Sequence, residues 1–293
     1  MKKVLFVFNP HSGKAQIKNF LLEIVDTMVK AECEVTIYPT QSQGDAARVV
    51  AEASEEYEVI VCSGGDGTLD EAVTGMMRRE KQLPLGYIPA GSTNDFATSL
   101  GIPRDMVRAA ETAVTGESFR CDIGAFNEDY FVYVAAFGLF TEVSYKTSQE
   151  WKNMLGHAAY ILEGAKRLYD IPSFLMQVEY NNKRVQDEFI FGMISNSTSV
   201  GGFKGMTGKD VLLDDGVFEV TLIKKPRNPI ELNEIIASLI NLVDDTDMVY
   251  SFKTSEVKFL ARSPIAWTLD GEFGGEHKEV VVKNLRQAIE IVT

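Results

Sequence analysis

Three short segments rich in Gly, Ser, Thr and Asn hold residue types that bind phosphate groups. They are Asn9–Gly13, Gly64–Thr68 and Gly91–Asn94, and a helical pattern follows each of them. Glycine lets a backbone approach a phosphate closely, and the N–H groups at a helix start favour negative charge. Thr68 and Thr93 can donate hydroxyl hydrogen bonds to phosphate oxygens. The three segments therefore indicate a phosphate site.

Each segment on its own is as typical of a tight strand-to-helix turn as of a binding loop, because Ser, Thr, Asn and Asp favour helix N-caps. Three such segments together favour binding. Asp66 would repel a phosphate unless a Mg²⁺ ion or a sugar hydroxyl lay beside it. The chain contains neither G-x-x-x-x-G-K-[ST] nor a well-placed G-x-G-x-x-G. The site is therefore neither a P-loop nor the usual dinucleotide fingerprint.

The elements that carry these segments are predicted strands, each followed by a helical pattern. The strands are Val4–Phe8, Glu34–Tyr38, Val59–Cys62 and Leu85–Ile88. Four strand–loop–helix repeats predict a parallel sheet with helices on both faces. Ligands of such sheets bind outside the carboxyl ends of the strands, where all three segments lie.

Beyond about residue 120 the pattern changes to short alternating strands. Hairpins are expected about Asn127–Asp129 and about Asn181-Asn182. Runs of short antiparallel strands predict a β-sandwich. Further strands are expected at 211–223, 256–260, 264–269 and 279–282, and helices at 154–169 and 229–242.

The length of 293 residues suits two domains. We expect residues 1–125 to form the α/β domain and residues 126–285 the β-sandwich. A last strand at about 286–293 is expected to return to the first domain. No low-complexity linker or internal repeat marks the boundary between them.

Composition limits the compartment and the partners. Three cysteines, Cys33, Cys62 and Cys121, are too few and too widely spaced for a disulfide framework or a zinc site, which favours a reducing, cytoplasmic compartment. The net charge of −13 argues against a nucleic-acid partner and against a polybasic membrane anchor. No stretch approaches the roughly 18 apolar residues that span a bilayer. Any contact with lipid would therefore be transient.

Several segments of the second domain allow two interpretations from their pattern. Asp214-Asp215-Gly216 and Asp270-Gly271 are typical of turns, and Asp-Gly is a strong hairpin signal that would hold Glu272 rigidly beside it. The apolar stretch Tyr130–Phe140 could be core or could line an acyl-chain cleft. The loop Val200–Met206 could be an ordinary surface loop or a lid.

Five motifs in order resemble a known family. Gly64–Glu71, Gly-Gly-Asp-Gly-Thr-Leu-Asp-Glu, resembles the signature shared by diacylglycerol, sphingosine, ceramide and NAD kinases and phosphofructokinases. Asn9–Gly13 and Pro89–Ala97 resemble the catalytic domain of diacylglycerol-type lipid kinases. Leu213–Gly216 and Leu269–Glu272 lie where that family carries its metal and catalytic motifs. The resemblance covers nearly the whole chain and is nearest to the soluble bacterial lipid kinases.

The resemblance implies a Rossmann-like first domain, as in NAD kinases and phosphofructokinases, with ATP and Mg²⁺ as the cofactors. The implied reaction moves the γ-phosphate of ATP to a lipid hydroxyl, with diacylglycerol as the first candidate. By motif, the following residues should line the ATP site: Asn9, Pro10, His11, Ser12, Gly13, Thr40, Gly64, Gly65, Asp66, Gly67, Thr68 and Thr93.

The resemblance also assigns the catalytic and metal residues. Glu272 matches the family's general base, which takes the proton of the lipid hydroxyl, and Asp270 would assist through metal or hydrogen bonding. A hard-oxygen site of this kind suits Mg²⁺. The implied structural Mg²⁺ site consists of the Asp215 carboxylate and the backbone carbonyls of Leu212 and Val217. Asp122 would be linked to this metal through a water molecule.

Alternatives remain open at this point. Phosphatidylglycerol, undecaprenol and sphingoid bases also present a hydroxyl beside apolar chains. An NAD kinase is the rival enzyme, although Gly91–Ala97 has the lipid-kinase form and the Asn-Glu element typical of NAD kinases is absent. A nucleotide-sensing module without turnover is the rival from another class, against which the intact Asp66 and Glu272 argue. The resemblance is compatible with a homodimer.

Overall fold

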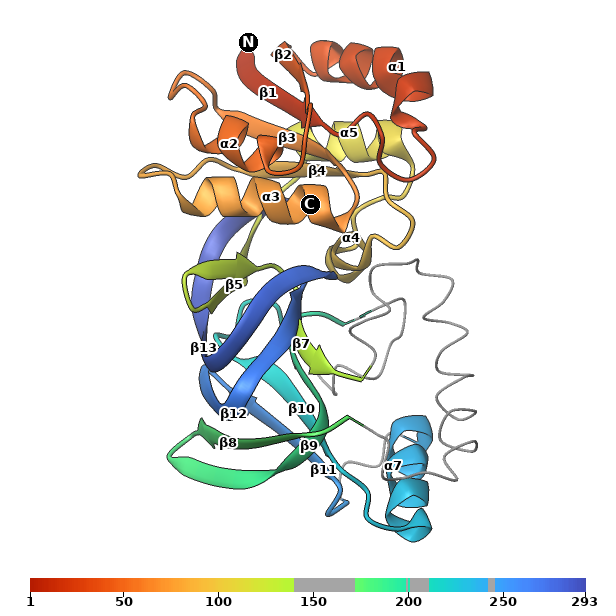
Figure 1. Ribbon diagram of the computed structural model, residues 1–293. Helices are drawn as coiled ribbons and strands as arrows, with labels where there is room; N and C mark the ends of the chain where they lie inside the picture. The colour runs from red at the N-terminus through yellow and green to blue at the C-terminus, as the bar shows by residue number, and fades with distance from the viewer. Residues whose placement is uncertain (140–171, 199, 201–210, 242–245) are drawn as a thin grey trace. The chain divides into compact units, whose positions relative to one another are not determined.

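The structure is a computed structural model that describes residues 1–139, 172–198, 200, 211–241 and 246–293 (Figure 1). The chain divides into two compact units, Met1–Ile123 with Arg286–Thr293, and Gly124–Leu285. The helix expected at 154–169 and residues 201–206 of the expected loop lie outside the described residues. Within the described part, no helix is long and apolar enough to cross a membrane.

The sheet of the first unit is built from parallel pairs. Its strands are β1 (Lys2–Phe8), β2 (Cys33–Pro39), β3 (Val59–Gly64), β4 (Leu85–Pro89) and the end of β13 (Glu272–Val292). β1 lies between β2 and β3, β3 pairs with β4, and β4 pairs with the last residues of β13. Val4, Phe6 and Val7 are fully buried. β1, β3 and β4 contain continuous buried runs, as expected for strands covered on both faces, whereas β2 is largely exposed.

The first unit has five helices. They are α1 (Ile17–Lys30), α2 (Asp45–Ala51), α3 (Asp66–Met77), α4 (Asp95–Leu100) and α5 (Met106–Thr115). The packing of α1, α2, α3 and α5 against the strands of this unit confirms the α/β domain. α1 packs with α5 and α2 packs with α3, one pair on each face (Figure 1). Ile17, Ile24 and Met28 recur at helical spacing and form the buried side of α1. The Asp105 side chain caps α5 by accepting the Arg108 N–H at 2.9 Å.

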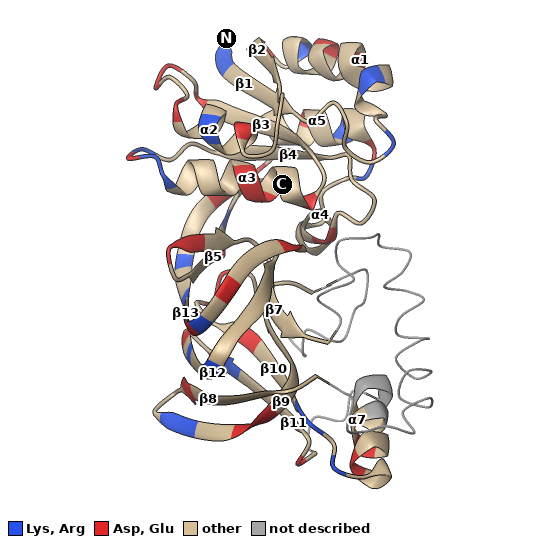
Figure 2. Ribbon diagram, in the orientation of Figure 1, with Lys and Arg blue, Asp and Glu red and all other residues tan. Residues whose placement is uncertain are grey.

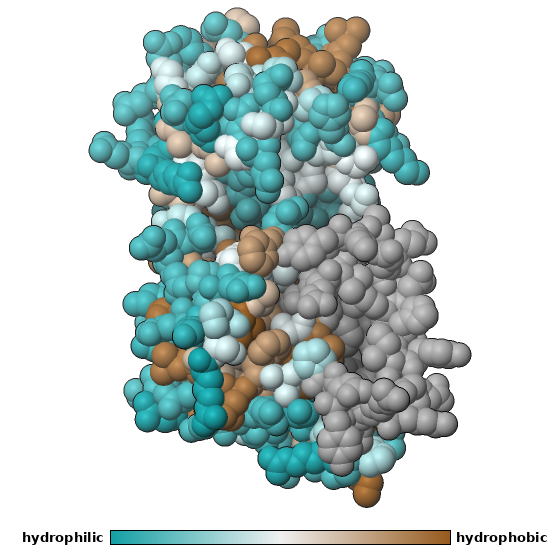
Figure 3. Space-filling view, viewed as in Figure 1, coloured by the Kyte–Doolittle hydropathy of each residue, from teal (hydrophilic) through white to brown (hydrophobic). Residues whose placement is uncertain are grey.

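The outer side of α1 remains apolar. Leu22 is 81% exposed and Val29, seven residues later, is 49% exposed. Figure 3 shows a hydrophobic area of the surface over α1. Residues seven positions apart lie on the same side of a helix. These side chains therefore add nothing to the buried core of the unit.

The second unit is antiparallel and rich in strands. Its elements are the end of β5 (Ser118–Phe126), β6 (Asp129–Phe131), β7 (Val134–Gly138), β8 (Phe174–Tyr180), β9 (Lys183–Ser195), β10 (Phe218–Lys224), α7 (Pro229–Asn241), β11 (Val249–Thr254), β12 (Glu256–Leu269) and most of β13. Both expected hairpins are confirmed: β5 pairs with β6, and β8 pairs with β9. Asn127, Asn181 and Asn182 have positive φ in their turns. Asparagine tolerates this conformation better than most residues.

β7 and β8 have the same two neighbouring strands. Both strands pair with β9 and with β12. On β9, Phe191 lies opposite Gly138 of β7, and Phe189 lies opposite Phe174 of β8. β7 and β8 therefore pair with successive stretches of the same two strands.

The core of the second unit is aromatic. Phe131 and Phe137 are fully buried, and the Phe137 ring lies 4.8 Å from that of Trp267 and 5.9 Å from that of Phe259, centroid to centroid. Rings at such distances gain attraction beyond their buried area. The side chains of Phe131 and Phe137, in the stretch Tyr130–Phe140, therefore belong to the core.

The strand expected at 211–223 is corrected by the structure, because β10 begins only at Phe218. Gly216 has φ of +85°. The Asp215 Oδ1 accepts the Val217 N–H at 3.1 Å. A side-chain bond of this kind together with a left-handed glycine forms a turn, which interrupts strand pairing.

Candidate active site

The first phosphate segment is bonded to the second. The Asn9 N–H donates to the Ser63 carbonyl at 2.9 Å, and the Gly65 N–H donates to Ser12 Oγ at 3.2 Å. The Asn9 Nδ2 lies 3.5 Å from Thr68 Oγ1. The Asn9 Oδ1 accepts the N–H of His11 at 2.9 Å, which closes the turn. Backbone and side chains therefore fix these two loops to each other.

The second segment is equally close to the third. The Gly64 carbonyl accepts the Ala90 N–H at 2.7 Å. A Cβ on Gly91 would lie 2.6 Å from the Gly65 Cα, and a Cβ on Gly13 would lie 2.3 Å from the Ala90 carbonyl oxygen. Only glycine fits where two backbones come this close. The structure thus brings all three predicted segments to one sheet edge.

Asn94 shapes the third segment, a role that sequence reasoning missed. Its Oδ1 accepts the Gly91 N–H at 3.0 Å, and its Nδ2 donates to the Gly91 carbonyl at 2.9 Å. Its backbone is left-handed, with φ of 53° and ψ of 53°. Asparagine tolerates this conformation, and the position just before the helix beginning at Asp95 was the available signal.

The start of α3 faces this junction with its backbone N–H groups. Gly65 is the N-cap residue, and no side chain caps it. The amides of Asp66 and Gly67 belong to the first turn, where no acceptor exists within the helix. Figure 2 shows acidic residues at this end of α3, where the sequence has Asp66, Asp70 and Glu71. The N–H groups favour an anion, whereas the nearby carboxylates require a cation beside it.

The start of α2 already carries a carboxylate from the same chain. Glu71 Oε1 accepts the Gly44 N–H at 2.7 Å, and Oε2 accepts the Ala46 N–H at 3.2 Å. This helix start is therefore neutralised by Glu71, another residue that sequence reasoning missed. Thr40 is buried next to it and donates its N–H to the Phe8 carbonyl at 2.9 Å, so it extends the sheet edge.

The remaining predicted nucleotide residues differ in exposure. Thr68 is buried, Thr93 and Pro10 are half-buried, and His11 is exposed. Pro10 belongs to the first segment, Thr68 to the second, and Thr93 precedes Asn94 in the third. All twelve lie in the first unit, along the ends of β1, β2, β3 and β4.

Replacing Gly91 by Ala should weaken nucleotide binding at least about 10-fold, since the new Cβ would force the second and third segments apart. Calorimetric titration with ATP measures the loss. Gly101→Ala is the control for an added methyl group without a clash, because Gly101 lies in the first unit and no atom stands within 4 Å of its Cβ position. Unlike Gly91, Gly101 has positive φ, so this control also carries the backbone strain of alanine. Equal affinity in the Gly91 variant would show that this close approach has no part in binding.

Both predicted catalytic residues lie at the hairpin between β12 and β13, Asp270 within its turn and Glu272 at the start of β13. Leu269 pairs with Glu272 across a two-residue turn, in which Asp270 has φ of 50° and Gly271 has φ of 88°. These angles match the tight hairpin turn that Asp-Gly predicts. Glu272 is exposed, and it comes directly after the turn.

The Asp270 carboxylate is occupied by backbone groups. It accepts the N–H groups of Val132 at 2.5 Å, Tyr133 at 2.9 Å and Val134 at 2.9 Å, and its side chain is buried. The Asp270 N–H in turn donates to the Val134 carbonyl at 2.8 Å. Three backbone donors therefore occupy acceptor positions of this one carboxylate. This geometry gives Asp270 a positioning task; its catalytic assistance stays a prediction.

The residues of the predicted metal site fall in both units. Asp215, Leu212 and Val217 belong to the second unit, and Leu212 is 57% exposed. Asp122 belongs to the first unit, is fully buried, and accepts the Gln287 N–H at 2.7 Å. Among the described residues, no group of three or more His, Cys, Asp and Glu could hold a metal. The predicted set uses one carboxylate and two carbonyls, which are hard donors that suit Mg²⁺.

A further carboxylate lies near the Asp215 turn. Glu219 on β10 is only 5% exposed, and Lys253 Nζ of β11 lies 2.9 Å from its Oε1. Burial raises the pKa of Glu219, the ammonium of Lys253 opposes this rise, and the negative charge of Asp215 adds to it. Glu219 and Lys253 therefore form an ion pair near the Asp215 turn, in which the carboxylate is the buried partner.

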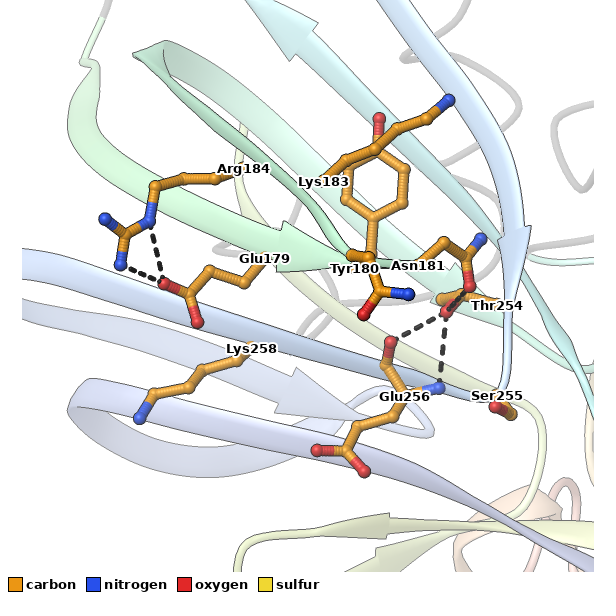
Figure 4. Close-up of a pocket in the computed structure, with 10 residues that line it drawn as sticks. Glu179, Tyr180, Asn181, Lys183, Arg184, Thr254, Ser255, Glu256 and Lys258 are labelled. Atoms are coloured by element: carbon orange, nitrogen blue, oxygen red, sulfur yellow. Dashed lines mark hydrogen bonds and ion pairs between the residues drawn. The ribbon is translucent and has the colours of Figure 1, made fainter.

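A pocket of about 550 Å³ opens in the second unit, at the β8–β9 turn and the connection from β11 to β12 (Figure 4). Its lining is polar and charged. Arg184 Nη2 lies 2.6 Å from Glu179 Oε1, and the Thr254 hydroxyl donates to Asn181 Oδ1 at 3.0 Å (Figure 4). Acyl chains require apolar walls, so this pocket does not match the chemistry of a lipid-tail site.

Comparison with known proteins gives the family. Residues 3–126 match the diacylglycerol kinase catalytic domain. A diacylglycerol kinase of Staphylococcus carnosus (strain TM300) is 35% identical over 295 residues, which cover 100% of this chain and 95% of that protein. A diacylglycerol kinase of Bacillus subtilis (strain 168) is 34% identical over 279 residues, covering 94% of this chain and 91% of that protein.

A solved structure shares the fold. The crystal structure of a diacylglycerol kinase from Bacillus anthracis str. Sterne superposes with a TM-score of 0.77 at 22% identity, covering 99% of this chain and 96% of that one. The match to the Staphylococcus carnosus protein extends over the whole chain, so it includes the three phosphate segments and the Asp270 turn. The chain therefore belongs to the diacylglycerol kinase family.

Proposed function

We propose that this protein is an ATP-dependent lipid kinase that phosphorylates diacylglycerol to give phosphatidate and ADP. The observation that carries this proposal is the meeting of three glycine-rich segments at the start of α3, in a chain whose relatives along their whole length are diacylglycerol kinases. The meeting of the three segments supports a phosphate site, and the relatives support diacylglycerol as the phosphate acceptor.

The proposed reaction uses the residues in distinct ways. N–H groups at the start of α3 and the hydroxyl of Thr68 hold the phosphates of ATP. Bound Mg²⁺ would neutralise charge on those phosphates. The carboxylate of Glu272 takes the proton of the lipid hydroxyl as its oxygen bonds to the γ-phosphorus. The bond from the γ-phosphorus to the bridging oxygen breaks, and ADP leaves with that electron pair.

Finer features of the fold and its surroundings belong to the same proposal. The first unit is proposed to be Rossmann-like, of the NAD kinase and phosphofructokinase kind, and the second a β-sandwich. Asp215 with the carbonyls of Leu212 and Val217 is proposed to hold a structural Mg²⁺, linked through water to Asp122. The protein is proposed to work in the cytoplasm with transient contact to a membrane, and as a homodimer, which sedimentation analysis can test.

Other acceptors are tested directly. The purified protein is incubated with γ-labelled ATP and, separately, diacylglycerol micelles, phosphatidylglycerol, undecaprenol, a sphingoid base or NAD. The expected result is label in phosphatidate, at a rate at least about ten times that with any other acceptor, and its loss when EDTA removes Mg²⁺. Label in NADP instead would make the protein an NAD kinase. Label in no product, with ATP still bound, would make it a nucleotide sensor.

A further inference from the structure

Tyr87 stands out among the buried groups of the first unit. It lies on β4 between Gly86 and Ile88, and it is only 1% exposed. Its hydroxyl donates to the Gly64 carbonyl at 3.1 Å and lies 3.4 Å from the Asn94 Oδ1. A buried phenol needs a polar partner, and here both neighbouring groups belong to phosphate segments.

The partner carbonyl gives this contact its importance. The Gly64 carbonyl and the Gly65 N–H belong to one planar peptide group. Tyr87 donates to the carbonyl end of that plane, and Ser12 Oγ accepts the hydrogen bond from its N–H end at 3.2 Å. The two side chains therefore hold the same peptide from opposite sides. Because Gly65 is the N-cap of α3, that peptide sets where the helix begins.

The second neighbour joins the third segment to this point. The Asn94 Oδ1 near the Tyr87 hydroxyl also accepts the Gly91 N–H. Asn94 closes its loop through Gly91, whose Cα approaches that of Gly65. The Tyr87 hydroxyl thus stands where the second and third segments meet. Phenylalanine at this position would keep the ring and its packing but would lose both polar contacts.

The protonation state suits a hydrogen-bond donor. Burial raises the pKa of the Tyr87 phenol well above its ordinary value, and the negative charge of Asp66 raises it further. The hydroxyl therefore stays protonated throughout the pH range in which a kinase works. The hydroxyl also lies close to the start of α3, because its partner Gly64 precedes the N-cap residue Gly65.

We propose that the Tyr87 hydroxyl is a positioning group for the nucleotide: it fixes the Gly64–Gly65 peptide against Asn94 and so aims the first amides of α3 at the phosphates. This inference rests on the proposed function, because it requires ATP at that helix start. Tyr87 itself does not touch the reacting atoms. Its effect is therefore on nucleotide affinity and not on the chemical step.

Tyr87→Phe tests the proposal. Loss of one such buried hydrogen bond should raise the Kd for ATP and the KM for ATP about 3- to 10-fold, while the KM for diacylglycerol stays within about 2-fold. Hydrogen exchange of the Gly65 and Ala90 amides should accelerate in the variant. Ile88→Val is the matched control, because Ile88 is also fully buried on β4 and loses a methylene without losing a polar contact.

The control separates positioning from general weakening. Both variants should lower the thermal midpoint by a similar amount, but only Tyr87→Phe should change ATP affinity and the exchange of Gly65. Equal ATP affinity in the two variants would overturn the proposal. Absence of ATP binding by the unmodified protein would refute the proposed function itself, and this outcome is seen before any variant is compared.

Discussion

Replacing Glu272 by Gln should lower kcat by about 10²- to 10⁴-fold, the usual contribution of a general base, with the Kd for ATP unchanged within about 2-fold. Gln has the shape of Glu but cannot take the proton of the lipid hydroxyl. The two-residue turn before it sets the backbone position of residue 272 in both forms. Single-turnover transfer of label from ATP to diacylglycerol measures the chemical step, and calorimetry measures the affinity.

A matched variant on the same strand controls for charge. Glu276 is exposed and lies four residues after Glu272 on β13, so Glu276→Gln removes one carboxylate from the same element. This control should transfer phosphate at the rate of the unmodified protein. If Glu272→Gln also did so, Glu272 would not be the base and the chemical part of the proposal would fail.

Replacing Asp270 by Ala should destabilise the protein by about 3 kcal/mol, because three buried N–H groups would lose their acceptor at once. The left-handed backbone at Asp270 adds about 1 kcal/mol of strain for Ala. Urea unfolding measures the loss. Asp270→Asn keeps an acceptor oxygen and a residue that tolerates positive φ, so it should fall between the unmodified protein and Asp270→Ala.

Activity distinguishes the two roles of Asp270. If this residue positions the turn, kcat should fall in step with stability along the series Asp, Asn and Ala. An Asp270→Asn variant that is as stable as the unmodified protein but inactive would contradict the positioning role. It would support direct participation of the carboxylate in the chemistry.

The local sequence was sufficient to predict the strands and the phosphate segments of the first unit. β1 and β3 are continuous apolar runs, and such runs are buried on both faces of a parallel sheet. The three phosphate segments lie at the carboxyl ends of β1, β3 and β4. Their meeting at one edge of the sheet is therefore a consequence of the parallel topology. The Asp-Gly and Asn-Asn turns were predictable for the same local reason, since few residues adopt positive φ.

Contacts between distant parts of the chain could not be predicted in this way. Asp270 bonds Val132, which is 138 residues away, and Asp122 bonds Gln287, which is 165 residues away. Glu71 caps α2 from another helix. No periodicity links such pairs, because the partner is a backbone N–H and every residue except proline has one. The prediction of a strand for the first residues of 211–223 was wrong for the opposite reason. There a local Asp-Gly turn interrupts the strand that the apolar pattern indicated.

Tyr87 illustrates a third limit. Its place in an apolar strand run predicts burial and nothing else. The proposed role of its hydroxyl depends on the positions of the Gly64 carbonyl and the Asn94 side chain, which the sequence does not give. Buried polar groups of this kind become visible once the hydrogen-bond partners are known.

The most direct test of the whole account measures both products of one reaction. The protein is mixed with γ-labelled ATP, Mg²⁺ and diacylglycerol micelles, and ADP and labelled phosphatidate are quantified over time. We expect one phosphatidate for each ADP, with no ADP formed when diacylglycerol is left out. ADP formed without phosphatidate, or bound ATP that stays intact in the presence of diacylglycerol, would contradict the proposed function.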